Sequence, residues 1–279
     1  MKKIALITGL ICLLISACGG RQTKSEATEQ SGSDYLFTIP SADGLCLYGI
    51  QDGPQTMSAE LFKGFDNALL DSLLPEGQAE AGFNVFLLQQ KGHVVLFDAG
   101  LGAAKGGRLL EALDSLGVAR EQVTDICLTH LHFDHVGGLF APDSTAMFPA
   151  AILHIPQPEY EACASGLLGN ADLASLLTRS YGERVHLFSP GDTLVEGVCS
   201  IAAPGHTPGH TIYDLGGVLV AGDIMHAVSL QLEHPEFCAR FDADPAQAVI
   251  TRRAVLDRAR KEHLTLCGMH FPKPLAIQF

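Results

Sequence analysis

The sequence predicts an α/β domain in which layers of strands and helices enclose one hydrophobic core. Short segments rich in β-branched and large apolar residues recur from residue 35 onward, bounded by Gly, Pro, Asp or Asn. Helical patterns occur between them. Hydrophobic residues make up 47% of the 279 residues and charged residues only 18%, so the chain can bury a large core. The predicted strands are Tyr35–Ile39, Cys46–Ile50, Val85–Gln89, His93–Phe97, Asp125–Thr129, Ile152–Ile155, Val185–Phe188, Val198–Ala202, Thr211–Leu215, Val218–Ala221 and Leu264–Cys267.

Two segments carry clear helical signals. Arg108–Leu116 places four leucines on one face. A longer helix begins at Asp244, a capping residue followed by proline at the first helical position, and runs to about Glu262. Its expected buried side consists of Ala246, Val249, Ile250 and Leu256. Its expected solvated side consists of Arg252, Arg253, Arg258, Arg260 and Lys261.

The N-terminal residues 1–17 are predicted to be a lipoprotein signal peptide. Two lysines precede an apolar run of about twelve residues, too short for a membrane span of about 20. The stretch that ends at Cys18 resembles a bacterial lipobox, which implies cleavage before Cys18 and lipid attachment to it. An ordinary secretory signal is the alternative. Residues 18–34 are expected to form a flexible tether and residues 35–279 the folded domain, exported and lipid-anchored to the bacterial cell envelope, on the periplasmic side or the cell surface.

The charge of the chain disfavours nucleic acid as a partner. Asp and Glu number 31 against 18 Lys and Arg, a formal charge of −13. Removal of the signal peptide takes away two lysines and leaves −15. A protein held by phosphate contacts needs a basic stripe. The acidic balance therefore argues against a nucleic-acid binder.

The cysteines are expected to be mostly unpaired. Six of them follow Cys18, and no CxxC spacing occurs. Three lie in apolar runs that read as buried strands, where a free thiol packs as a small hydrophobic group. These three are Cys127, Cys199 and Cys267.

The most informative stretch is Thr129–His135, with the sequence THLHFDH, at the end of a predicted strand. His130 and His132 are two residues apart, so they point the same way in an extended chain. Asp134 and His135 can turn toward a neighbouring position. Zinc binds imidazole nitrogen at about 2.0–2.1 Å and carboxylate oxygen at a similar distance. A His-rich surface loop is the alternative, and the crowding of three His and one Asp at a strand end disfavours it.

Further donors follow other predicted strands. His206 and His210 come after Val198–Ala202 in the stretch PGHTPGH, Asp223 comes after an apolar strand, and His270 comes after another. Each donor thus follows an apolar run and a small residue. Rigid strands can hold such side chains accurately enough for metal chemistry.

Together these motifs resemble the metallo-β-lactamase superfamily over roughly residues 83–272. The resemblance implies a four-layer αββα sandwich, with the metal site at the strand ends between the two sheets. It implies two divalent metal ions, with zinc expected. Asp98 is implied to support the metal loop without binding metal, and His206 is preferred to His210 as a ligand. The implied ligands are His130, His132 and His206 for one ion, Asp134, His135 and His270 for the other, and Asp223 as a bridge.

The resemblance also implies a hydrolase. Two ions lower the pKa of a shared water, and the bridging hydroxide attacks a lactone, ester or phosphotriester, with Asp134 orienting it. True β-lactamases carry Cys or Ser where this chain has Asp223, so antibiotic hydrolysis is not expected. The residues after Asp223 are similar to the methyl-parathion-hydrolase-like branch, which neighbours the N-acyl-homoserine lactonases. His226 replaces a tyrosine common in lactonases; it is expected to contact the substrate or protonate the leaving group, or alternatively to hydrogen-bond a metal ligand.

Several alternatives stay open at this stage. A glyoxalase II-like thioester hydrolase and a non-catalytic metal-binding lipoprotein both fit the motif. A homodimer is suggested by the resemblance alone. The short stretch after His270 suggests a shortened closing strand region. Apolar residues expected either to cover the metal cleft or to belong to the core are Phe62, Phe65, Leu69, Leu70, Met225, Leu230, Leu232 and Phe237.

Overall fold

The computed structural model describes residues 34–41, 44–62 and 66–279. The predicted signal peptide, Cys18 and nearly all of the predicted tether lie outside these residues. Among the helices of the described ranges, none is both long and apolar enough to cross a bilayer.

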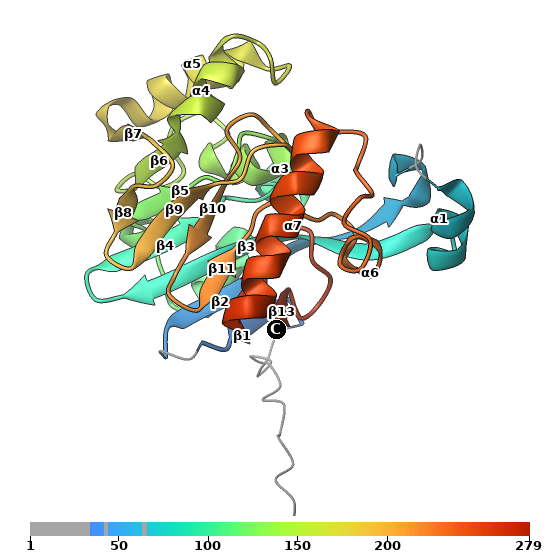
Figure 1. Ribbon diagram of the computed structural model, residues 1–279. Helices are drawn as coiled ribbons and strands as arrows, with labels where there is room; N and C mark the ends of the chain where they lie inside the picture. The colour runs from blue at the N-terminus through green and yellow to red at the C-terminus, as the bar shows by residue number, and fades with distance from the viewer. Residues whose placement is uncertain (1–33, 42–43, 63–65) are drawn as a thin grey trace, which may run out of the picture.

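The described strands form two mixed sheets (Figure 1). In the first sheet, β1 to β4 pair antiparallel and β4 to β7 pair parallel. Its strands, in order, are β1 (Leu36–Ile39), β2 (Cys46–Ser58), β3 (Gln78–Gln90), β4 (His93–Phe97), β5 (Asp125–Cys127), β6 (Ile152–Pro156) and β7 (Val185–Phe188). In the second sheet only β11 and β12 pair parallel. Its strands, in order, are β13 (Ala276–Gln278), β12 (Thr265–Cys267), β11 (Val218–Val220), β10 (Thr211–Asp214), β9 (Val198–Ala202) and β8 (Thr193–Val195).

Helices cover the outer faces of both sheets and give the four layers that the resemblance implies. The α-helices are α1 (Asn67–Leu73), α2 (Leu109–Ser115), α3 (Phe133–Val136), α4 (Gln157–Ala164), α5 (Ala171–Tyr181), α6 (Val228–Gln231) and α7 (Pro245–Glu262). Helices α2 and α5 pack on the first sheet, and α7 packs on the second. Between the sheets lies a core that includes Phe86, Phe97 and Tyr213. Burial of apolar side chains on both faces of each sheet stabilises this stack.

Strands β2 and β3 are much longer than predicted, and β13 was not predicted. The prediction ended β2 at Ile50, because Gly53, Pro54 and polar residues follow. In the structure β2 continues to Ser58 through a bulge between Gln51 and Gly53, paired with β3 along its length. Pairing with β3 thus outweighs the low strand propensity of the residues in the second half of β2. The segment after His270 forms β13, which pairs with β12.

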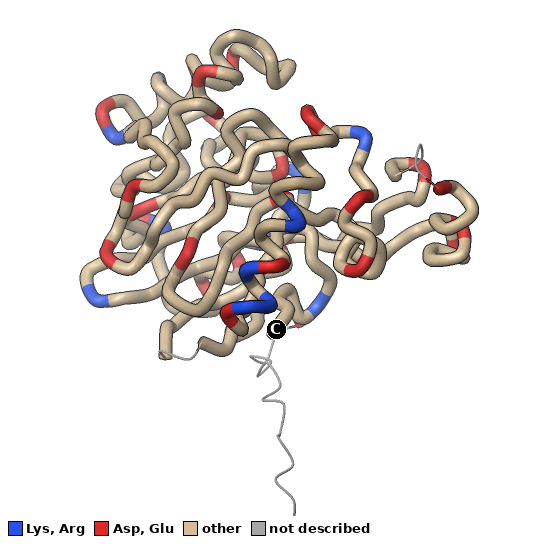
Figure 2. Tube along the Cα trace, viewed as in Figure 1, with Lys and Arg blue, Asp and Glu red and all other residues tan. Residues whose placement is uncertain are grey.

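Helix α7 has the predicted bounds but only part of the predicted buried face, since Leu256 is 1% exposed as expected. Asp244 caps it by accepting a hydrogen bond from the backbone N–H of Gln247. Arg252, predicted to be solvated, is 1% exposed, whereas Ile250, predicted to be buried, is 61% exposed. The Arg252 guanidinium donates to the backbone oxygens of residues 224, 235 and 237, so its burial is compensated. Figure 2 shows the basic segments of α7 interspersed with acidic ones.

The six described cysteines are all free, as expected. Cys127 and Cys267 are buried in strands. Cys163 and Cys238 are buried outside the predicted strands. Cys199 was predicted to be buried but is exposed, because its side chain faces away from the core on β9.

A row of polar side chains crosses strands β4 to β7. Because of its hydrogen bonds, we expect the stability of the fold to depend on pH. Asp125 lies 2.9 Å from His93 Nδ1 and 2.9 Å from His154 Nε2. Burial alone would raise the pKa of Asp125, but hydrogen bonds from His154, His93 and Thr124 outweigh it and lower the pKa to about 2. The resulting stability is present above pH 3.8, the ordinary value, and is lost as the pH falls through about 2.

We expect Asp125→Asn to lower the free energy of unfolding by about 2 kcal/mol at pH 7 and to have little effect near pH 2. Urea unfolding at both pH values measures the difference. The matched control is Asp172→Asn, an exposed carboxylate on α5, for which we expect no change. Equal stability of Asp125→Asn and the wild type at pH 7 would contradict the assignment.

Candidate metal centre

Seven donor side chains meet at one end of the two sheets. Four come from the loop after β5 and from the short helix α3, one from the loop between β9 and β10, and two directly follow β11 and β12. Segments far apart in the chain therefore supply one site, because these strands end at the same edge of the sandwich. These side chains are His130, His132, Asp134, His135, His206, Asp223 and His270; the neighbouring His226 and Asp242 also have a potential donor atom within the same clusters.

Three imidazoles form the first group. His130 Nε2 and His206 Nε2 each lie 3.0 Å from His132 Nδ1 and 3.2 Å from one another. Each nitrogen has one lone pair or one proton in that direction, so hydrogen bonds cannot satisfy all three contacts at once. Tetrahedral zinc with ligands at 2.0–2.1 Å keeps its nitrogens about 3.3 Å apart. The triad therefore fits a cation at its centre.

A carboxylate and two imidazoles form the second group. Asp134 Oδ2 lies 3.6 Å from His135 Nε2 and 3.5 Å from His270 Nε2. Within the described ranges the buried His135 Nε2 has no hydrogen-bond partner. Such an orphaned buried nitrogen is costly unless a ligand occupies its lone pair.

Asp223 stands between the two groups. Its Oδ2 lies 3.3 Å from His206 Nε2 on one side and 3.4 and 3.1 Å from His135 and His270 Nε2 on the other. Its other oxygen is buried and has no hydrogen-bond partner among the described residues. One carboxylate oxygen that faces both groups is the arrangement needed for a bridging ligand.

The outer nitrogens of the histidines are held by a second set of groups. Such partners orient metal-binding imidazoles and raise their basicity. The pairs are His130 Nδ1 with Thr129 Oγ1 (3.0 Å), His135 Nδ1 with Asp98 Oδ2 (2.7 Å), His206 Nδ1 with Asp242 Oδ1 (3.0 Å) and His270 Nδ1 with Gly82 O (2.9 Å). Asp98 also accepts hydrogen bonds from the backbone N–H and the hydroxyl of Thr129, at 2.7 and 2.8 Å. It therefore lies where the resemblance expects a supporting residue.

The electrostatics of the site suit a divalent cation. Burial lowers the pKa of His130 well below its ordinary value and that of His206 to about 3, so both offer lone pairs at pH 7. Burial raises the pKa of Asp223, but the neighbouring His135, His270 and His130 outweigh this and hold its pKa well below the usual range. Burial lowers the pKa of His135 and His270, but the charges of Asp223 and Asp134 outweigh it and raise both. This second group therefore attracts positive charge, which a bound metal ion would supply in place of the protons.

His210 and His226 lie beside the donors in different positions. His210 Nε2 accepts the backbone N–H of Asp223 at 2.9 Å, and its Nδ1 lies 3.0 Å from the backbone oxygen of Ala203. Both of its nitrogens are therefore used by backbone groups, one in its own loop and one after β11. His226 is fully buried, with Nε2 3.2 Å from Asp223 Oδ2, and does not line the cavity over the donors. The predicted contact of His226 with substrate stays a prediction.

A cavity of ≈ 280 Å³ opens over the donors. Side chains of His132, Asp134, Asp223 and His270 form part of its wall. No Lys or Arg belongs to the lining in the part of the chain that the structure describes. The remaining described wall residues are Gln55, Met57, Phe83, Phe133, His206 and Phe241.

Different residues were predicted from the sequence for this wall. Those of the eight candidates that the structure describes do not line the cavity, and Phe65 lies outside the described residues. Phe62, Leu70 and Phe237 instead form a separate core at the end of the long β2–β3 hairpin. Two wall residues missed from the sequence, Phe133 and Phe241, directly precede Asp134 and Asp242 in the chain. Adjacency to a donor or its partner was the available signal.

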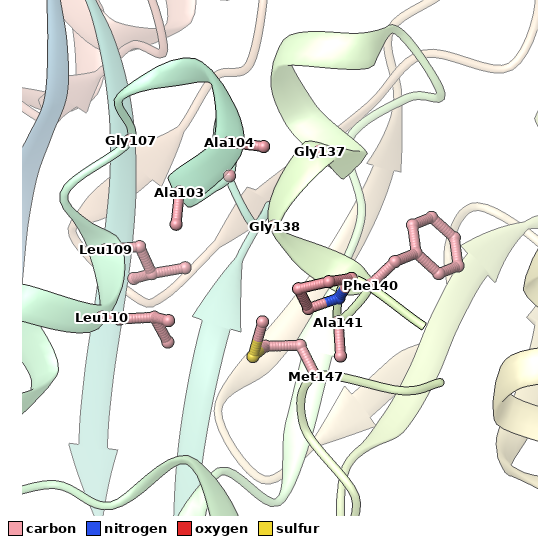
Figure 3. A pocket seen from close by; sticks show the side chains of 12 residues that line it. Ala103, Ala104, Gly107, Leu109, Leu110, Gly137, Gly138, Phe140, Ala141 and Met147 are labelled. Atoms are coloured by element: carbon pink, nitrogen blue, oxygen red, sulfur yellow. The ribbon is translucent and has the colours of Figure 1, made fainter. Parts of the chain in front are cut away.

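A second cavity, of ≈ 220 Å³, lies against the segment 137–142 that follows the motif (Figure 3). Its described wall consists of Gly, Ala, Leu and Pro residues with Phe140 and Met147. The wall contains no His, Asp, Glu or Cys among the described residues. Five of the donor side chains line the first cavity instead.

Residues 83–270, more than half of the chain, match the model of the metallo-beta-lactamase superfamily. The chain belongs to this superfamily. Among curated relatives, it is 32% identical over 167 residues to a hydroxyacylglutathione hydrolase of Acidiphilium cryptum, covering 57% of this chain and 56% of that protein. It is 29% identical over 148 residues to the uncharacterized protein YobT of Bacillus subtilis, covering 50% of this chain and 60% of that protein. The chain thus spans little more than half the length of these superfamily relatives.

Solved structures of the superfamily fold extend the match over most of the chain. The dizinc quorum-quenching lactonase AidC superposes with a TM-score of 0.77 at 22% identity, over 87% of this chain and 92% of that one. The hydrolase AbOPH superposes with a TM-score of 0.76 at 27% identity, over 90% of this chain and 91% of that one. The two-sheet architecture and its helices are therefore those of the superfamily.

Proposed function

We propose that this chain is a dinuclear metal-dependent hydrolase. The observation that carries the proposal is the convergence of donor atoms from both groups on Asp223 Oδ2. His130, His132 and His206 would hold one ion, and Asp134, His135 and His270 the other. Asp223 would bind both. The dizinc relative AidC supports zinc as the metal.

The residues of the site have distinct tasks in this proposal. When bound, two divalent ions polarise a carbonyl or phosphoryl oxygen and lower the pKa of a water molecule. Asp134 lies in the cavity wall, so one of its oxygens can accept the proton of the attacking water. The carboxylates of Asp134 and Asp223 offset the repulsion between two cations. The apolar wall excludes bulk water from the substrate.

The lining favours a neutral, largely apolar substrate. Phe83, Phe133, Phe241 and Met57 offer apolar and aromatic surface, and Gln55 adds one polar amide. We therefore propose a lactone, an ester or a phosphotriester. The AidC structure holds an N-hexanoyl-L-homoserine product, which supports the lactone class. The wall has the composition expected of a pocket that binds an acyl chain or an aryl group.

A thioester hydrolase is the second candidate, because several curated relatives are hydroxyacylglutathione hydrolases. Glutathione carries two carboxylates, and the described wall offers no cationic side chain to them. A panel of an acyl-homoserine lactone, an aryl phosphotriester and a glutathione thioester, tested on zinc-loaded protein, separates the candidates. Selective cleavage of the thioester would overturn the preferred substrate class. Failure to cleave any of the three would favour a metal-binding protein without catalytic activity.

His226 is proposed to act through Asp223. We expect His226→Ala to lower kcat about 10-fold to 100-fold, because its Nε2 faces Asp223 Oδ2. The loss should be equal for substrates with good and with poor leaving groups. Turnover of a series of aryl esters, with metal content measured in parallel, tests this. His234→Ala is the control, since His234 is half-buried away from the cavity.

Other outcomes with His226→Ala separate the remaining roles. A loss that grows with the pKa of the leaving group would instead identify His226 as a proton donor. Unchanged turnover with unchanged metal content would remove both roles.

We also propose export and lipid attachment at Cys18, on the sequence alone. The expected result of Cys18→Ala is a shift of the protein from the membrane fraction to the soluble fraction of the producing bacterium. Membrane association that persists in this variant would argue against lipidation at Cys18.

A further inference from the structure

A buried glutamate, Glu159, lies behind the metal centre and connects two of the loops that carry its ligands. It is the third residue of α4, which starts directly after β6. Its side chain is fully buried. It lines neither described cavity and belongs to no group of converging metal donors among the described residues. Its burial therefore needs another explanation.

The two carboxylate oxygens of Glu159 hold different loops. Oε1 accepts the backbone N–H of Leu131 at 3.0 Å, and Oε2 accepts the backbone N–H of Gly209 at 2.9 Å. Leu131 stands between His130 and His132, and Gly209 follows His206 by three residues. The carboxylate thus joins the two segments that together supply the three-imidazole group.

A close backbone contact supports the same connection. A Cβ atom on Gly209 would lie 2.2 Å from the backbone nitrogen of Glu159 and 2.5 Å from its Cα. The first turn of α4 therefore packs directly on the second loop, and only glycine allows this approach. A further backbone hydrogen bond joins the same loops, from the N–H of Thr211 to the oxygen of Thr129 at 2.9 Å.

We infer that Glu159 is a positioning residue that sets the spacing of His130 and His132 relative to His206. This inference rests on the proposed metal site. A charge-assisted hydrogen bond from each loop to one rigid carboxylate limits the separation of the loops. The three imidazole nitrogens then stay within the 3.0–3.2 Å at which they face a common centre. The second group has further supports of its own, because Asp98 contacts His135 and the backbone oxygen of Gly82 contacts His270.

The test is a Co²⁺ titration of the apo protein, followed by absorption spectroscopy and calorimetry. We expect Glu159→Gln to weaken one of two Co²⁺ binding steps about 10-fold to 100-fold. Glutamine keeps the shape of the side chain but replaces one of the two acceptor oxygens by an NH₂ group. This group is a donor and would face a backbone N–H, which is also a donor. The Co²⁺ spectrum of the weakened step should change, while the other step stays within about twofold. Gly209→Ala should weaken the same step by steric separation.

Matched variants make the outcomes separable. Glu161→Gln, an exposed glutamate on the same helix, should leave both steps unchanged. If circular dichroism shows that Glu159→Gln does not fold, Glu159→Asp replaces it, because its shorter side chain cannot reach both loops. Two tight binding steps in folded Glu159 and Gly209 variants would overturn this inference alone. A wild-type chain that binds no Co²⁺ would overturn the proposed function and this inference with it.

Discussion

Replacement of Asp223 by alanine is expected to lower kcat/KM by on the order of 10³-fold and to reduce the metal content below one ion per chain. Asp223 Oδ2 faces nitrogens of both ligand groups, at 3.3 Å from His206 and 3.1 Å from His270. Without this carboxylate, two cations would lie close together with less negative charge between them. Both sites therefore weaken together.

Steady-state kinetics and metal analysis of the same preparation measure this effect. Asp257→Ala is the matched control, because the side chain of Asp257 is 80% exposed on α7. We expect the control to retain two ions and full activity. Retention of two tightly bound ions in Asp223→Ala would contradict the bridging role.

Asp98→Asn is expected to lower the free energy of unfolding by about 3 kcal/mol, the size of effect seen when a buried charged pair is broken. The Asp98 carboxylate is fully buried and accepts hydrogen bonds from the N–H and hydroxyl of Thr129, beside His135 Nδ1 at 2.7 Å. An asparagine amide has one acceptor oxygen, so at least one donor loses its partner. Asparagine tolerates the left-handed backbone of this residue, at φ 62°, so the substitution tests the hydrogen bonds rather than the backbone.

Chemical denaturation of the metal-free protein measures the Asp98 effect without the contribution of bound metal. Asp143→Asn is the control, since Asp143 is exposed and accepts hydrogen bonds from the nearby Thr145. If the unfolding curves of Asp98→Asn and the wild type coincide, Asp98 does not support the loop that contains Thr129 and His135.

The cluster of donor side chains could be predicted because each donor follows a strand that is recognisable on its own. His130, Asp223 and His270 all come directly after short apolar runs, and parallel or adjacent strands carry their ends to one edge. The remaining donors were predicted from the resemblance of the motifs to those of the metallo-β-lactamase superfamily. The residues that hydrogen-bond to the donors and position them were harder to predict, because their partners lie far away in the sequence.

Arg252 and Glu159 illustrate what a single sequence does not reveal. Both are charged residues that are almost fully buried. Their burial depends on backbone groups of residues 224, 235 and 237 for Arg252, and 131 and 209 for Glu159. Local patterns treat such residues as solvated, because charged side chains are rarely buried without partners. Only the tertiary structure provides those partners.

The strand ends were misjudged for a related reason. The second half of β2 contains Gly53 and Pro54, which weaken a strand locally. Its continuous pairing with β3 compensates for these residues. This extension brings Gln55 and Met57 into the cavity wall, so the same error concealed part of that wall.

The number of metal ions in the purified protein tests the central proposal most directly. Native mass spectrometry of the zinc-loaded chain, with elemental analysis of the same sample, gives this number. We expect two ions per chain, both removed by a chelator and both restored by added zinc. A chain that holds one ion or none after loading would contradict the dinuclear centre.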